Sequence, residues 1–173
     1  MGQSGNPNLY HTWNVCLSII NTWDCEPEEM WKPSYSTLLQ VFVSIQSLVM
    51  TQEVIQMEPC HEHYEIGSKA NMEYSMIVEY ANIKYAITGM IQNPPVEFAD
   101  IVRKHFAIKK EKTLESFEKW LKKAENFEFT GCDPLIRGHN CVTADILEAY
   151  GPYSAFKEAI EECKVWLDTL QEI

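Results

Sequence analysis

The feature that most constrains the fold is an apolar segment at residues 38–49, because hydrophobic side chains occupy nearly every face of the helix that it predicts. The side chains with a 3.6-residue period are Leu38, Phe42, Ile45 and Val49, and those on the flanks are Leu39, Val41, Val43 and Leu48. Thr37, with Gln40 three residues later, forms a capping-box pattern that would start this helix. A helix that is apolar all round is expected to be central in its domain.

Four further helices are predicted, at about residues 72–92, 95–106, 113–126 and 152–170. Asn93-Pro94-Pro95 separates the first two of these. The first would bury a face made of Met76, Tyr80, Ile83, Ile87 and Met90, and the last a face made of Phe156, Ile160, Cys163, Leu167 and Leu170. We expect the last helix to pack on its own domain, with docking to a partner helix as the alternative.

The remaining segments are predicted to be irregular. Residues 1–33 are rich in proline and other turn-forming residues, so we expect loop with at most a short strand. Residues 51–71 lack periodicity and are also expected to be loop. Residues 127–151 contain three glycines and a proline, which indicates a linker with one helical turn, at residues 144–149.

Charge excludes some classes of function. The 173 residues carry a net charge of −11, but eight of the 14 basic residues lie between Arg103 and Lys123. An acidic chain repels phosphate backbones, so we expect no nucleic-acid binding and interpret the basic segment as a solvated helix face. No apolar run is long enough to span a bilayer, so no membrane association is expected.

Cysteine usage indicates a reducing compartment. The six cysteines are irregularly spaced, and the polar N-terminus has no signal-peptide pattern, so we expect cytoplasmic or nuclear localisation with reduced thiols. Metal binding is not predicted, because the candidate ligands lack the paired spacing of zinc sites. These candidates form two groups, one of Cys60, His61 and His63 and the other of Cys132, His139 and Cys141. No phosphate-binding or dinucleotide-binding motif is present, so no cofactor is expected.

Cys16 is the cysteine whose surroundings suggest chemistry. A thiolate can attack a carbonyl or thioester carbon, and an amide donor nearby can stabilise the oxyanion that develops. Asn8 could supply that donor if the chain folds back behind Pro7. By spacing alone, a buried and inert cysteine remains the more common alternative.

The region around Cys16 resembles the active-site stretch of ubiquitin-conjugating enzymes, in which an asparagine precedes the catalytic cysteine by eight residues. The matching segments are Asn6-Pro7-Asn8, Leu9-Tyr10, Val15-Cys16-Leu17-Ser18-Ile19, Trp31-Lys32-Pro33 and the helix at residues 39–48. The resemblance extends to about residue 123. Residues 23–31, 93–98 and 103–106 further resemble the large hybrid conjugating enzyme–ligases, in which asparagine also replaces histidine at the position of Asn6.

The resemblance implies an α+β fold of the ubiquitin-conjugating type, with the N-terminal helix and most of the antiparallel sheet missing, so that this chain is mainly helical. Without that sheet, the helix at residues 38–49 would expose a large apolar face. The implied organisation is the C-terminal part of the catalytic domain at residues 1–125, a linker at residues 126–151 and an amphipathic helix at residues 152–173.

The implied function is that of a transferase. Cys16 would accept ubiquitin from the activating enzyme as a thioester and pass it to a lysine of a protein substrate, with or without a ligase. Asn8 would donate to the oxyanion or hold the active-site turn. Acidic residues that could orient the incoming amine are Glu26, Glu28, Glu29, Glu58 and Glu62.

Three departures from the family pattern favour an alternative function. Only five residues precede Asn6, Trp13 takes the place of a usual glycine, and Cys60 takes the place of another. The alternative is a catalytically inactive conjugating-enzyme-like fragment that binds ubiquitin or a ligase.

Overall fold

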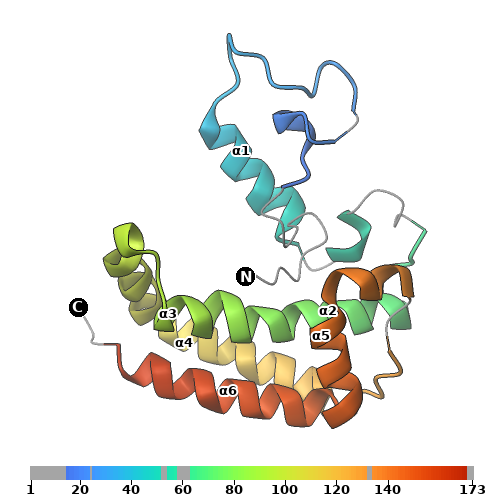
Figure 1. Cartoon of the computed structure of the whole chain (residues 1–173), viewed down its shortest axis with the longest axis vertical. Helices are drawn as coiled ribbons and strands as arrows, with labels where there is room; N and C mark the ends of the chain where they lie inside the picture. The colour runs from blue at the N-terminus through green and yellow to red at the C-terminus, as the bar shows by residue number, and fades with distance from the viewer. Residues whose placement is uncertain (1–14, 24, 52–53, 58–62, 132–133, 171–173) are drawn as a thin grey trace. The chain divides into compact units, whose positions relative to one another are not determined.

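The computed structural model describes residues 15–23, 25–51, 54–57, 63–131 and 134–170, and for residues 57 and 134–141 it describes the backbone alone. The chain divides into two compact units, Met1–Ser75 and Met76–Ile173. Figure 1 shows the helices of both units. Within the described residues, no helix has the length and apolar content needed to cross a membrane.

The first unit is built around one short helix and the loops beside it. The helix α1 (Leu38–Ser44) continues into the π-helical segment η2 (Ile45–Val49), and the short 3₁₀ segments η1 (Ser18–Ile20) and η3 (Val54–Met57) lie on either side in sequence. Its hydrophobic cluster joins the buried Leu17, Val41 and Val49 to the partly buried Val15, Ile19, Ile20, Trp31 and Ile45. This cluster therefore fastens the loop around residues 15–20 to the inner side of α1 and η2.

The start of α1 is as predicted. Thr37 accepts a hydrogen bond from the Gln40 backbone N–H, while the Gln40 side chain accepts one from the Thr37 backbone N–H, so both halves of the capping box form. These bonds satisfy two N–H groups that a helix leaves without intrahelical partners.

The prediction that this helix is central is wrong, whereas the expected exposed apolar face is confirmed. Leu39 is 70% exposed, and Leu38, Phe42 and Val43 are also exposed. The hydrophobic cluster brings residues 15–31 against one side of a helix that is apolar all round, and these exposed side chains are not among the residues of the cluster. The chain is mainly helical, as expected: no described residue lies in a strand, and Val15 forms only an isolated β-bridge. The α+β class of the complete fold stays a prediction.

The helix predicted at residues 72–92 is confirmed and begins three residues earlier. It consists of α2 (Lys69–Ala81), the π-helical segment η4 (Asn82–Gly89) and α3 (Met90–Gln92). Met76, Tyr80 and Ile83 are buried, as their spacing predicts. Residues of α2 from Met76 onward belong to the second unit.

The prediction of two separate helices between residues 95 and 126 is wrong. After the 3₁₀ segment η5 (Val96–Phe98), a single helix, α4 (Ala99–Ala124), spans the whole region. The intervening residues 107–112 contain no glycine or proline, and four of the six are charged helix formers. These residues show no apolar periodicity because this part of the helix is little buried. The buried residues of α4, Phe117 and Ala124, both lie closer to its C-terminal end.

The prediction of a single helical turn between residues 127 and 151 is also wrong. The helix α5 (Pro134–Tyr150) occupies most of this segment. Proline is compatible with a first helical position, and the roughly 1 kcal/mol cost of a glycine inside a helix is offset when the helix buries apolar side chains. Ala144 and Leu147 are fully buried, and α5 packs against α6.

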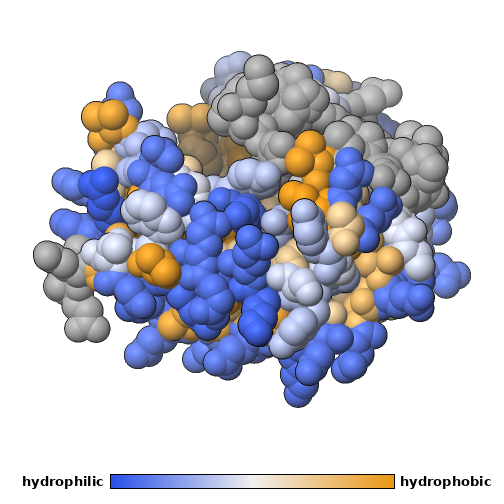
Figure 2. Space-filling model, turned by 60° about the horizontal axis from the view of Figure 1, so that its bottom comes forward, coloured by the Kyte–Doolittle hydropathy of each residue, from blue (hydrophilic) through white to orange (hydrophobic). Residues whose placement is uncertain are grey.

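The second unit is organised around α6 (Pro152–Asp168), which packs against α4, η4 and α5. Its inner face is the predicted one, with Phe156, Ile160, Cys163 and Leu167 buried. This confirms that the last helix packs within its own unit. The face of the molecule in Figure 2, on the side of α6, is mostly hydrophilic. Gly151, with a φ of +74°, joins α5 to α6 in a backbone conformation that favours glycine. The proposed division into domains stays a prediction.

Candidate active site around Cys16

Cys16 lies in the loop that leads into η1, and its thiol is half-buried. The next residue, Leu17, is extended, with φ −148° and ψ 139°, and is only 5% exposed. Side chains alternate in direction along an extended chain. The burial of Leu17 in the hydrophobic cluster therefore helps to place Cys16 toward the outside of the unit.

Thr22 contacts three consecutive residues around Cys16. Its hydroxyl group donates to the Val15 carbonyl oxygen at 2.6 Å and accepts from the Leu17 backbone N–H at 2.9 Å. The Cys16 thiol donates to the Thr22 carbonyl oxygen at 3.4 Å. The Thr22 backbone N–H also donates to the Leu17 carbonyl at 3.2 Å. Sequence reasoning missed Thr22, although short hydroxyl side chains often bond to the backbone of nearby turns.

Asn21 closes the turn between Cys16 and Thr22. It ends η1 in the left-handed conformation, with φ 60° and ψ 28°, which asparagine tolerates better than most residues. Its side-chain oxygen accepts a hydrogen bond from the Trp31 backbone N–H at 3.2 Å. The loop that carries Cys16 is thus tied to the segment before α1.

The other predicted catalytic residue, Asn8, lies outside the described residues, as do Glu58, Glu62 and Trp13. Their roles stay predictions. The three described acids, Glu26, Glu28 and Glu29, are exposed and lie in a turn closed by the hydrogen bond from the Glu29 N–H to the Glu26 carbonyl.

The metal-binding candidates fall largely outside the described part of the chain. Cys60, His61 and Cys132 are not described, and for His139 and Cys141 only the backbone is. His63 is exposed, and its ring lies 4.2 Å from that of Tyr64. Across the described ranges, no three His, Cys, Asp or Glu side chains form a group that could hold a metal ion.

A second thiol, Cys163, is in a different environment. It is fully buried on the inner face of α6, and burial raises the pKa of its thiol, with a hydrogen bond to Thr88 acting in the opposite direction. A buried cysteine that holds its proton is a poor nucleophile. Of these two thiols, Cys16 is therefore the better candidate for attack on an acyl group.

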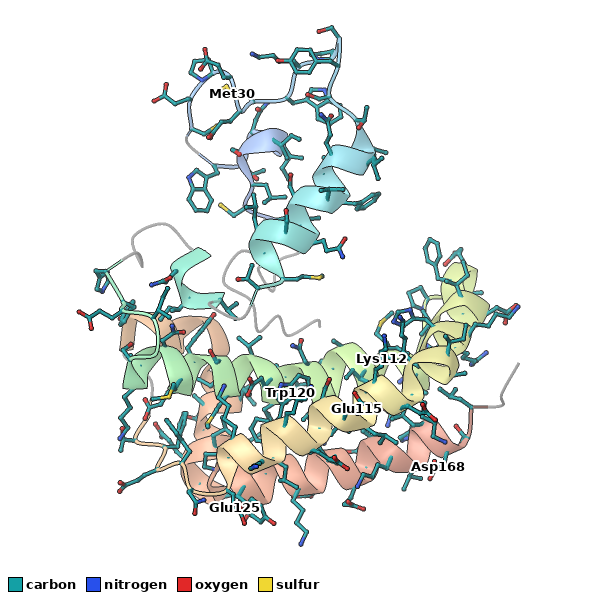
Figure 3. The ribbon with its side chains drawn as sticks, turned by 180° about the vertical axis from the view of Figure 1, so that it is seen from behind. Met30, Lys112, Glu115, Trp120, Glu125 and Asp168 are labelled. Carbon is teal, nitrogen blue, oxygen red and sulfur yellow. The ribbon has the colours of Figure 1, made fainter. Side chains whose placement is uncertain are left out.

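The basic segment at residues 103–123 lies on α4 and behaves as the predicted solvated face. Seven of its eight basic side chains are exposed, and Lys110, the exception, is paired with Asp168 at 2.8 Å. Figure 3 shows Lys112, Glu115 and Trp120 along α4 and Asp168 near the end of α6.

Several known proteins that are similar to the chain are named for one class of enzyme. A match of 119 residues, 40% identical and covering 67% of this chain, joins it to the human dual E2 ubiquitin-conjugating enzyme/E3 ubiquitin-protein ligase BIRC6. The probable ubiquitin-conjugating enzyme protein 17 of Caenorhabditis elegans is 36% identical over 124 residues, or 70% of this chain. The putative ubiquitin-conjugating enzyme E2 38 of Arabidopsis thaliana is 35% identical over 107 residues, or 60% of this chain. No protein-family model matches the chain.

Over about two-thirds of its length, the chain is similar to proteins named as ubiquitin-conjugating enzymes, and the resemblance seen in its sequence is confirmed. A protein named as a dual conjugating enzyme and ligase is among its relatives. The aligned part spans only 2% of that human protein, 17% of the nematode protein and 32% of the plant protein.

Proposed function

We propose that the chain is a ubiquitin-conjugating transferase that carries ubiquitin on Cys16. The Cys16 thiolate attacks the thioester carbonyl carbon of ubiquitin bound to the activating enzyme. A new sulfur–carbon bond forms at Cys16, and the sulfur of the activating enzyme leaves and takes up a proton. A substrate lysine amine then attacks the Cys16 thioester, an amide bond forms, and the Cys16 thiol is released with the proton that the amine loses.

The observation that supports this proposal most strongly is the homology of two-thirds of the chain to enzymes named for ubiquitin conjugation. The half-buried position of Cys16, beside a buried anchor at Leu17, is compatible with attack by an external amine. Asn8 is proposed to stabilise the oxyanion or the active-site turn. Because the reaction needs a reduced thiol, we propose that it takes place in the cytoplasm or the nucleus.

The test is formation of a thioester by the full chain. The protein is incubated with activating enzyme, ATP and ubiquitin, and the products are separated on a non-reducing gel. We expect an adduct of one ubiquitin that disappears when a thiol reductant is added. Cys16→Ala should abolish the adduct, whereas Cys16→Ser should give an oxyester that resists the reductant.

Cys25→Ala is the matched control, because Cys25 is also half-buried and belongs to the same unit. It should leave the adduct unchanged. An adduct that persists in Cys16→Ala, or is lost in Cys25→Ala, would overturn the assignment of the nucleophile. If no adduct forms at any enzyme concentration while ubiquitin still binds the chain, the inactive binding module is the correct function.

A further inference from the structure

We propose that Thr22 is the positioning residue of Cys16: its hydroxyl group holds the backbone on both sides of the cysteine, and its carbonyl group orients the sulfur. The inference deepens the proposed function and rests on it for the role of Cys16. It names a residue that does not touch the acyl group but acts through the nucleophile.

The hydroxyl group of Thr22 is both a hydrogen-bond donor and a hydrogen-bond acceptor. It donates to the Val15 carbonyl at 2.6 Å and accepts from the Leu17 N–H at 2.9 Å. The Leu17 carbonyl oxygen also lies 3.1 Å from it. Because Val15 and Leu17 are the two neighbours of Cys16, these bonds restrain the backbone immediately before and after the nucleophile. A side chain without a hydroxyl can make none of them.

The main chain of Thr22 makes a second set of contacts. Its carbonyl oxygen accepts the Cys16 thiol at 3.4 Å, and its N–H donates to the Leu17 carbonyl at 3.2 Å. The sulfur is therefore directed toward a carbonyl whose own position depends on the hydroxyl-anchored turn. Loss of the hydroxyl is expected to release the turn and, with it, the direction of the sulfur.

Packing gives Thr22 little other importance. The residue is exposed and is not among the residues of the hydrophobic cluster. Valine carries a methyl group where threonine carries the hydroxyl, so Thr22→Val removes the side-chain hydrogen bonds and keeps a β-branched side chain at this position. Thr22→Ser keeps the hydroxyl and removes only the methyl group, which makes it the matched control.

The experiment measures Cys16 in two independent ways in the full chain. First, the rate of alkylation by iodoacetamide is followed from pH 6 to pH 9 by peptide mass spectrometry, with Cys25 as the internal reference. Second, the rate of ubiquitin thioester formation is measured. In Thr22→Val we expect alkylation of Cys16 about threefold faster, because the sulfur is no longer held at the carbonyl. We expect thioester formation to be about tenfold slower, because the free energy of roughly one hydrogen bond that orients the nucleophile is lost. Thr22→Ser should restore both rates to within about twofold.

The outcomes separate the two proposals. If no thioester forms in any variant but Thr22→Val still changes the alkylation of Cys16 alone, the proposed function fails and the positioning role stands. If Cys16 is alkylated at the same rate in Thr22→Val and the original protein, the positioning role is overturned. An equal change at Cys25, together with a lower melting temperature, overturns it as well, since the effect would then be general loosening.

Discussion

Lys123, at the end of α4, donates a 2.9 Å hydrogen bond to Oε1 of Glu79 on α2. The other carboxylate oxygen of Glu79, Oε2, is buried and has no hydrogen-bond partner in the described structure. Burial raises the pKa of Glu79, and the charge and hydrogen bond of Lys123 only partly oppose this effect. The pair therefore joins two helices of the second unit at the cost of a partly desolvated carboxylate.

This relationship predicts a pH dependence of stability. A carboxyl group whose pKa is raised by folding stabilises the protein below its unfolded pKa, here about 4.5, and this stabilisation is lost as the pH rises through the folded pKa. Glu79→Gln cannot titrate, so its free energy of unfolding should fall less than that of the original protein between pH 4 and pH 7. Urea denaturation at several pH values measures this difference.

Glu161→Gln provides the control for Glu79→Gln. Glu161 also forms a lysine pair, with Lys164 at 3.0 Å, but its side chain is 64% exposed. Its substitution should change the free energy of unfolding little, because exposed pairs are screened by solvent. The same pH profile for Glu79→Gln and the original protein would contradict the prediction.

Leu17 should be essential for the stability of the first unit. Leu17→Ala removes a buried side chain from the cluster around Val41 and Val49, and such substitutions cost about 2–5 kcal/mol. Leu39→Ala, at a position that is 70% exposed, should change the free energy of unfolding by less than about 0.5 kcal/mol. Chemical denaturation of both variants checks the contrast, and equal effects would show that the cluster is not the core of the unit.

The capping box at the start of α1 should contribute measurably to the free energy of unfolding. Thr37→Ala removes the acceptor of the Gln40 N–H and should cost about 1 kcal/mol. Thr37→Ser keeps an oxygen at the same place and should recover most of this loss. The measurement is the free energy of unfolding of the three proteins, and a destabilised Thr37→Ser would mean that the methyl group, not the cap, is important.

The continuity of α4 can be tested at Lys109. This exposed residue lies between the two helices that the sequence predicted separately, at residues 95–106 and 113–126. In a continuous helix, Lys109→Gly should be about 1 kcal/mol less stable than Lys109→Ala, because glycine loses more backbone entropy. If the two variants are equally stable in urea denaturation, residues 107–112 are not helical.

Sequence patterns correctly predicted those features of the fold that depend on residues only a few positions apart. The capping box at Thr37 works through atoms three residues apart, and the buried face with Met76, Tyr80 and Ile83 follows from helical spacing. The prediction of two helices in place of α4 and the prediction of a single helical turn in place of α5 were wrong for one reason. Apolar periodicity shows which side chains are buried, and glycine content shows how readily a segment forms a helix. Neither shows where a helix ends, because the backbone can continue through exposed or glycine-containing turns when packing elsewhere supports it.

In the candidate site, too, one residue could be predicted from the sequence and another could not. Cys16 could be predicted as the candidate nucleophile because its neighbours resemble a known active-site pattern, and the resemblance of the chain to ubiquitin-conjugating enzymes is confirmed by its relatives. Thr22 carries no pattern of its own. Its importance appears only when the turn at Asn21 brings its hydroxyl group back to Val15 and Leu17.

The amino-acid sequence by itself determined the helical character of the chain, the inner faces of the α2–η4 helix and of α6, and the cysteine to which function is proposed. Each of these depends on residue type and on spacing within a few residues. Tertiary structure alone decided which side of the apolar helix α1 is covered, how far α5 extends, and that Thr22 lies against the backbone of Cys16's neighbours. These features depend on which segments pack together, and burial and hydrogen bonding between segments are properties of the folded chain rather than of any short stretch of sequence.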